Sequence, residues 1–224
     1  MDLEAVRARI AAAAWRAGRD PAAITIVAVT KGHPLATARA ALAAGLPDIG
    51  ENRVQEALEK MAAWPDAPVR WHLIGHLQRN KARLAVGRFA LVHSLDSARL
   101  ADALEKEAAA AGLVQDVLVQ VNVARERQKS GVAPEDAEAV IAHVEAQPHL
   151  RLQGLMTLAP LTDDIAVQRS TFRGLRELRD RLPRHPAPGA RHLSMGMSND
   201  FEIAVEEGAT MLRLGTVLFG ERQP

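Results

Sequence analysis

The sequence predicts an α/β fold, a single (β/α)8 barrel of the TIM type with an extra helix at its N-terminus. Short apolar runs alternate with helical patterns, and about 220 residues suffice for eight strand–helix units. The run at residues 24–30 carries no charge, which is typical of a strand buried on both faces of a parallel sheet. A doubly wound open sheet is the alternative. Without repeats or long linkers, one domain is expected over residues 1–224.

The expected elements follow from local patterns along the chain. Charges are scattered through residues 1–20, which predicts an amphipathic helix and not a signal peptide. The apolar runs that follow predict eight strands at residues 24–30, 48–50, 71–74, 89–93, 117–123, 150–157, 192–195 and 211–214.

Helices between these strands have recognisable start and stop signals. Ser97 is expected to cap a helix that Gly112 ends, and Pro134 to occupy the first position of the next helix. A third helix is expected to stop at Pro183, with residues 183–188 as the loop to the seventh strand. The apolar residues expected to face inward on these helices are Leu100, Ala101, Leu104, Ala108, Ala111, Val140, Ile141, Val144, Leu175, Leu178 and Leu182.

Composition excludes several classes of partner. The chain has 28 basic and 27 acidic residues, so nothing indicates a nucleic-acid partner. Aromatic residues make up 3%, and without tyrosine the sequence lacks both a stacking surface for single strands and a phenolic acid or base. With no cysteine, disulfides and thiolate chemistry are excluded, and the cytoplasm is the expected compartment. No uncharged run approaches the roughly 20 residues that a membrane span needs.

Lys31 is the first candidate for chemistry. It directly follows the first predicted strand, which Gly32 and Pro34 end, so its amine is expected at the carboxyl edge of the sheet, where barrels bind ligands. An amine between apolar walls loses its charge more readily, and a neutral amine attacks a carbonyl group to form a Schiff base. The alternative is a lysine that extends to water and has no chemical role.

Residues 194–200, SMGMSND, are the second candidate. They lie between the seventh strand and a helix expected to begin near Ser198 or Asn199, where hydroxyls and free backbone N–H groups bind anions. Residues 213–216, RLGT, add a cation and a second turn at the place where barrels commonly bind phosphate. A capped helix after a tight turn is the alternative without a ligand. Together with Lys31, these segments indicate a ligand with an aldehyde and a phosphate, such as pyridoxal 5′-phosphate (PLP).

Eight segments of the sequence resemble, in the same order, the pyridoxal phosphate homeostasis protein family, single-domain relatives of the alanine racemase N-terminal barrel. They are AVTKGHP, DIGENRVQE, WHLIGHLQRNK, HSLDS, VNVARERQKSG, GLMTLAP, LSMGMSNDFEIAVEEGATMLRLG and VLFGER. The resemblance implies that Lys31 holds PLP as a Schiff base. It also implies that Asn52 and Met156 lie beside the cofactor, and that Arg213 faces the pyridine nitrogen. The residues implied to hold the phosphate, partly through backbone N–H groups, are Ser194, Met197, Ser198, Gly215 and Thr216.

The resemblance implies a non-catalytic protein that buffers or delivers PLP in intracellular vitamin B6 homeostasis. A cation beside the ring nitrogen opposes its protonation, so the ring becomes a weak electron sink. Alanine racemase adds a tyrosine acid from a second domain and a partner subunit, and this chain has no tyrosine. That domain is expected to be absent, and a monomer is expected. The alternatives are an amino-acid racemase or related Schiff-base lyase, an aldolase of phosphorylated sugars, and an interaction protein that passes PLP to apo-enzymes.

Two positions depart from the family pattern. Arg53 stands where the family often has an aromatic residue, and His76 where proline is common, so both are expected to alter the pocket edge. His72 and His76 lie across a strand end and a turn, which does not match a helical metal site, and no metal is expected. Residues 129–131 are expected in a mobile rim or in an ordinary polar turn. The arginines between residues 173 and 184 are expected on a solvated helix face.

Overall fold

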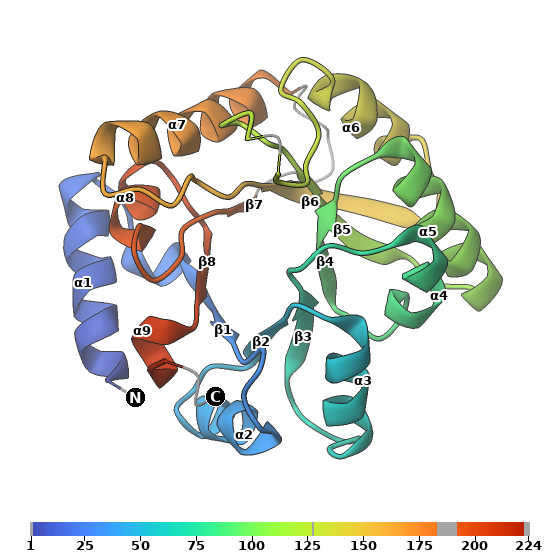
Figure 1. Ribbon diagram of the computed structural model, residues 1–224, viewed down its shortest axis with the longest axis horizontal. Coiled ribbons are helices and arrows are strands. Elements are labelled where there is room, and N and C mark those ends of the chain that lie inside the picture. The colour runs from blue at the N-terminus through green and yellow to red at the C-terminus, as the bar shows by residue number, and fades with distance from the viewer. Residues whose placement is uncertain (1, 127, 183–191, 222–224) are drawn as a thin grey trace.

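A computed structural model describes residues 2–126, 128–182 and 192–221, which form a closed barrel of eight parallel strands (Figure 1). The strands pair in chain order, and β1 closes the barrel by pairing with β8. Their bounds are β1 Thr25–Val29, β2 Asp48–Glu51, β3 Arg70–Leu73, β4 Leu91–Leu95, β5 Gln115–Gln120, β6 Leu150–Met156, β7 His192–Ser194 and β8 Met211–Leu214. The predicted (β/α)8 barrel is confirmed, and closure rules out the open sheet.

Helices form a ring outside the strands, and α1, Leu3–Arg16, is the predicted extra helix (Figure 1). Asp2 caps α1, which packs against α8 outside the barrel. None of the helices in the described part of the chain is long and apolar enough to cross a membrane. The remaining bounds are α2 Leu35–Ala43, α3 Val54–Ala62, α4 Ala82–Ala85, α5 Ala98–Ala111, α6 Ala137–Glu145, α7 Ile165–Arg181, α8 Phe201–Glu206 and α9 Thr216–Phe219, with 3₁₀ turns η1 Pro21–Ala23 and η2 Arg79–Lys81.

Helix α5 begins and ends where the sequence predicts. The Ser97 hydroxyl accepts a hydrogen bond from the Leu100 N–H at 3.3 Å, and Gly112 ends the helix with a left-handed φ of 64°. Ala111 does not face the core as expected. Residues 109–112 are all exposed, because the last turn of α5 lies outside the apolar packing.

Other predicted boundaries were wrong by a few residues. Helix α6 begins at Ala137 because the residues from Pro134 form a turn, in which the Asp136 N–H donates to Ala133 O. Strand β4 begins two residues after the predicted start at residue 89, because the Phe89 N–H donates a hydrogen bond to Ala85 O. Pro183 and the loop predicted at residues 183–188 lie outside the described residues.

The arginines of α7 are less solvated than expected. Arg173 and Arg176 form ion pairs with Glu207, at 3.1 Å and 2.9 Å, and Arg169 pairs with the same carboxylate at 2.9 Å. Glu207 is the residue that ends α8, so these pairs join α7 to α8. Arg184 lies outside the described residues.

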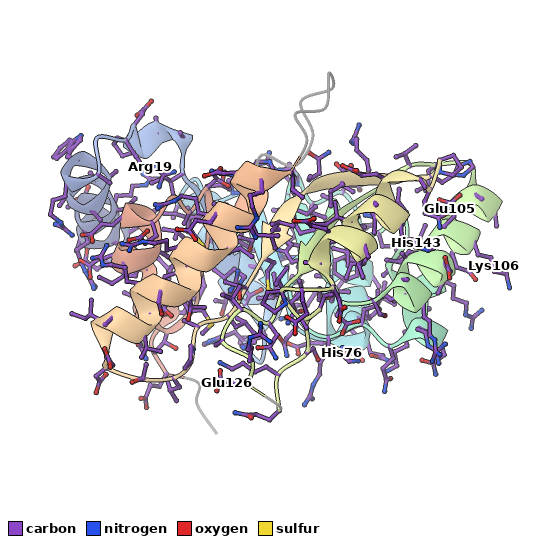
Figure 2. The ribbon with its side chains drawn as sticks, turned by 90° about the horizontal axis from the view of Figure 1, so that it is seen from above. Arg19, His76, Glu105, Lys106, Glu126 and His143 are labelled. Atoms are coloured by element: carbon purple, nitrogen blue, oxygen red, sulfur yellow. The ribbon has the colours of Figure 1, made fainter. Side chains whose placement is uncertain are left out.

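The barrel interior has an apolar layer below its carboxyl end. Leu91, Leu118, Met156 and Met211 form this layer, and Leu158 packs against it. The larger core lies between the sheet and the helices. Because side chains alternate along a strand, every second residue enters the interior. The loops at the carboxyl ends of the strands complete one edge of the barrel, and His76 and Glu126 mark this edge at the bottom of Figure 2.

Candidate functional site

A cavity of about 440 Å³ opens at the carboxyl ends of the strands, and the segments after β1, β2, β3, β5, β6, β7 and β8 line it. Most of the predicted site residues meet there. Those that line the cavity are Lys31, Asn52, Met197, Ser198, Arg213, Gly215 and Thr216. The structure therefore brings the lysine at the start of the chain and the two segments near its end to one space.

Met156 and Ser194 lie deeper than the cavity lining. Met156 belongs to the apolar layer inside the barrel, and Leu158, two residues further along the chain, lines the cavity. Ser194 is fully buried, and its hydroxyl accepts a hydrogen bond from Arg213. Both side chains lie inside the barrel, below the cavity.

The cavity lining is rich in basic groups. Lys31, Lys129 and Arg213 line it, whereas Asp200 is the one carboxylate among the described lining residues. Burial raises the pKa of Asp200, although a hydrogen bond from the Met197 N–H and the charge of Arg213 oppose this shift. This balance favours an anionic ligand.

Arg213 is held in place by neutral acceptors. Its side chain is buried, with 4% of its surface exposed, and burial lowers its pKa to about 10, so it remains protonated at neutral pH. One terminal nitrogen donates to Ser194 Oγ at 2.7 Å, and the other donates to Thr157 O at 2.8 Å. A guanidinium group has five N–H donors, so further donors remain for a ligand.

A buried ionic network holds the backbone on both sides of Lys31. Lys60 Nζ donates to Thr30 O at 2.8 Å, to Glu51 Oε1 at 2.6 Å and to Glu56 Oε1 at 3.0 Å. The Gly32 N–H donates to the same Glu56 oxygen at 2.6 Å. Residues on both sides of the lysine are therefore fixed by charged groups.

Within this network Glu51 is incompletely satisfied. Burial raises its pKa, although hydrogen bonds from Lys60 and Thr30 oppose the shift. Its Oε2 atom is buried without a hydrogen-bond partner among the residues that the structure describes. The sequence prediction missed this network, and its signals were a charged residue at the end of a buried strand and a Glu56–Lys60 pair four residues apart on a helix.

The two turns near the end of the chain are joined by a serine. Ser198 Oγ accepts a hydrogen bond from the Val217 N–H at 3.1 Å, which links the β7–α8 loop to α9. Helix α8 begins at Phe201 and not near Ser198, because Asp200 Oδ1 accepts from the Met197 N–H at 2.5 Å and closes a tight turn. The Met197 N–H is therefore not available to a ligand. The polar residues Ser198, Asn199 and Thr216 line the cavity here.

Lys129, which the sequence places in a rim or a polar turn but not among the site residues, lines the cavity. Its amine donates to Ala159 O at 2.8 Å and pairs with Glu126, so the β5–α6 loop contacts the β6–α7 loop at the mouth of the cavity.

Of the two departures from the family pattern, Arg53 is exposed beside α3. His76 Nδ1 lies 3.2 Å from Asp96 Oδ2. Neither Arg53 nor His76 lines the cavity. In the described ranges, no three His, Asp or Glu side chains are grouped to hold a metal ion.

Comparisons with known proteins identify relatives of this chain. Residues 1–223 match the family model of the alanine racemase N-terminal domain. The chain is 45% identical over 221 residues to a pyridoxal phosphate homeostasis protein of Aquifex aeolicus (strain VF5), covering 99% of this chain and 97% of that protein. It is 48% identical over 217 residues to the protein of the same name from Pseudomonas aeruginosa, covering 97% and 93%. The structure of PipY from Synechococcus elongatus PCC7942 with PLP bound is similar with a TM-score of 0.80 and 38% identity, covering 96% of this chain and 100% of PipY.

Proposed function

The chain belongs to the alanine racemase N-terminal domain family and, within it, to the pyridoxal phosphate homeostasis proteins, and from this we propose that it binds PLP in the cavity at the carboxyl end of the barrel. The observation that carries this proposal is the meeting of Lys31, Arg213 and the turn at Ser198 in one cavity. An aldehyde, a ring nitrogen and a phosphate are the three groups of PLP that such a set can hold.

The cavity fits this cofactor in size and charge. Its volume of about 440 Å³ is within the usual range for small-molecule sites. Three basic residues against one carboxylate suit the anionic phosphate. The apolar residues Val29, Ile74 and Leu158 supply walls for a flat ring. The residues therefore provide both the polar anchors and the apolar contacts that PLP requires.

We assign each predicted residue a role in holding the cofactor. Lys31 forms the Schiff base, and Arg213 donates to the ring nitrogen. Ser198, Gly215 and Thr216 hold the phosphate, and Asn52 and Met197 contact the cofactor from the sides. Met156 and Ser194 support the site from below the cavity.

The residue set favours a carrier over a catalyst. Bound PLP can supply an electron sink, but the permanent charge of Arg213 opposes protonation of the ring nitrogen and weakens that sink. The sequence also lacks tyrosine, the side chain that alanine racemase uses as an acid. We therefore propose that the protein works in the cytoplasm as a monomer that buffers PLP or delivers it to apo-enzymes.

Absorbance spectroscopy tests cofactor binding. Wild-type protein mixed with PLP should show a visible Schiff-base band, and borohydride should fix the cofactor to Lys31 in peptide mass mapping. Lys31→Ala should abolish the band. Lys106→Ala is the matched control, because Lys106 lies on the outer surface of α5, away from the carboxyl edge (Figure 2). A band that persists in Lys31→Ala, or a label on Lys129, would contradict the assignment.

Two assays test the carrier role. PLP-loaded protein should show no turnover of amino acids above that of free PLP, and sustained turnover that Lys31→Ala abolishes would favour a racemase or lyase. Reactivation of an apo-enzyme by the loaded protein should be faster in direct mixture than across a dialysis membrane. Equal rates would favour buffering over delivery by contact.

A further inference from the structure

A line of hydrogen-bonded polar side chains crosses the barrel interior below the cavity. His72 Nε2 lies 2.9 Å from Asp48 Oδ1, His72 Nδ1 lies 2.9 Å from His93 Nε2, and His93 Nδ1 lies 2.8 Å from Ser194 Oγ. Arg213 donates to the same serine oxygen at 2.7 Å. All five side chains are buried. We call Asp48, His72, His93 and Ser194 the interior chain, which ends on Arg213.

The interior chain connects two sides of the barrel. Asp48, His72 and His93 lie on the adjacent strands β2, β3 and β4, whereas Ser194 lies on β7. Strands β5 and β6 separate β4 from β7 in the sheet, so the bond between His93 and Ser194 spans the interior (Figure 1). At the other end, Arg70 donates to Asp48 at 2.6 Å and 2.5 Å from a side chain that is 60% exposed.

The positions of the protons decide which side chain donates and which accepts in each hydrogen bond of the interior chain. Burial raises the pKa of Asp48, but hydrogen bonds from His72 and Arg70 outweigh it and hold the pKa below its ordinary value, so the carboxylate only accepts. Burial holds the pKa of His93 well below its ordinary value, so this imidazole is neutral and carries one N–H. With one N–H on each imidazole, His72 donates from Nε2 to Asp48 and accepts at Nδ1.

The protons on His93 and Ser194 follow from the assignment for His72. His93 must donate from Nε2 to His72, and its Nδ1 atom must accept the proton of the Ser194 hydroxyl. The serine oxygen then presents only lone pairs to Arg213, which matches the observed bond. The reverse direction requires protons on both nitrogens of His72, with Asp48 as its counterion, whereas the direction described here needs one N–H on each imidazole.

We propose that the interior chain positions the Arg213 guanidinium for its bond to the ring nitrogen of PLP, with Ser194 and His93 as positioning residues. This inference rests on the proposed function, because it concerns how the site recognises the ring. A hydroxyl whose proton is committed to His93 is a fixed acceptor, so the guanidinium keeps one orientation. A guanidinium has only donors, so in this fixed orientation it selects a ring nitrogen with a free lone pair.

The test compares two ligands on Ser194 variants. PLP has a ring nitrogen, whereas in its 1-deaza analogue a C–H group replaces that nitrogen and offers Arg213 no acceptor. Ser194→Ala should raise the dissociation constant of PLP about tenfold, the order expected when a hydrogen bond to a charged group is lost. It should leave the dissociation constant of the 1-deaza analogue unchanged. Ser194→Thr, which keeps the hydroxyl, should restore PLP affinity.

The matched control is His143→Gln. His143 also pairs with a carboxylate, 2.6 Å from Asp102, but it lies on α6 at the outside of the molecule (Figure 2). This substitution should leave both dissociation constants unchanged. Equal losses for PLP and the 1-deaza analogue in Ser194→Ala would indicate general damage to the site and would overturn the proposal, as would no loss for either ligand.

Nitrogen-15 NMR of the histidines tests the direction of the interior chain without any cofactor. In the apo-protein, His72 and His93 should both carry their proton on Nε2. A proton on Nδ1 of His93 would overturn the proposal. If wild-type protein shows no visible band with PLP, the proposed function fails, whereas a wild-type band with a wrong tautomer or an indifferent Ser194→Ala variant refutes only this inference.

Discussion

Among the described residues, the buried cations Lys60 and Arg213 have different partners. Lys60, 7% exposed, contacts the carboxylates of Glu51 and Glu56. Arg213, 4% exposed, contacts a hydroxyl and a carbonyl, and within residues 2–126, 128–182 and 192–221 no carboxylate oxygen lies within 4.0 Å of its guanidinium. The charge of Asp200 favours the protonated guanidinium, but burying a cation that has no direct ion pair is costly. The difference indicates that Lys60 serves the fold, whereas Arg213 is kept for a ligand.

The largest effect is expected from removing the paired cation. Lys60→Met leaves two carboxylates without their partner beside Lys31 and should lower the free energy of unfolding by about 3–5 kcal/mol. Urea denaturation of the apo-protein measures this loss. The double variant Lys60→Met/Glu51→Gln should recover part of it, because the buried carboxylate is then neutral. A loss below about 1 kcal/mol, the scale of an exposed ion pair, would remove the contrast with Arg213.

Removing the other cation should affect binding more than folding. Arg213→Met deletes a buried cation that has no direct ion pair and feels only the more distant charge of Asp200, so the free energy of unfolding of the apo-protein should fall less than in Lys60→Met. The dissociation constant of PLP should rise about 10- to 100-fold, because a charged hydrogen bond to the ring is lost. Paired urea and absorbance titrations measure both quantities. A variant as unstable as Lys60→Met that still binds PLP normally would reverse the assignment of the two cations.

A smaller effect is expected at the phosphate end of the site. Ser198→Ala removes a hydroxyl that lines the cavity and accepts from the Val217 N–H, and should weaken PLP binding about tenfold. Pyridoxal, which has the aldehyde but no phosphate, should bind the variant and the wild type equally. Absorbance titration with both ligands separates the two ends of the site. An equal loss for pyridoxal would place Ser198 away from the phosphate.

The smallest effect concerns Glu207, whose counterions are partly exposed. Burial acts to raise its pKa, but hydrogen bonds from Arg173 and Arg169 outweigh it and lower the pKa. A lowered pKa gives stability that is present above the ordinary glutamate value of about 4.3 and is lost as the pH falls through the folded-state value. Glu207→Gln should therefore flatten the acid side of the stability profile.

Urea midpoints between pH 6 and pH 3, compared with the exposed control Glu138→Gln, measure the acid effect. If Glu207→Gln keeps the full acid dependence of the wild type, the arginines of α7 do not stabilise this carboxylate. Such a result would support the expectation from the sequence that the α7 arginines lie on a solvated helix face.

Much of the fold and part of the site follow from the sequence by local rules. The alternation of apolar runs and helical patterns is enough for the barrel, and strand ends are enough to place Lys31 and Gly215 at one edge. The depth of a side chain is not local information. Met156 and Ser194 are buried inside the barrel, but they lie below the residues that line the cavity, which their positions along the sequence do not reveal.

Contacts between distant segments could not be predicted in the same way. The bond between His93 and Ser194 joins strands that are not neighbours, so neither spacing nor periodicity indicates it. Lys129 reaches the cavity because its loop contacts the β6–α7 loop through Ala159 O. The start of α8 was misplaced because Asp200 captures the Met197 amide, which depends on one side-chain rotamer.

The central claim is that Lys31, Arg213 and the turns at Ser198 and Thr216 hold one PLP molecule together. A crystal structure of the borohydride-reduced complex tests this claim most directly. We expect continuous density from Lys31 Nζ to the cofactor, with the ring nitrogen facing Arg213 and the phosphate between the two turns. Density joined to Lys129, or a phosphate bound away from Ser198 and Thr216, would contradict it.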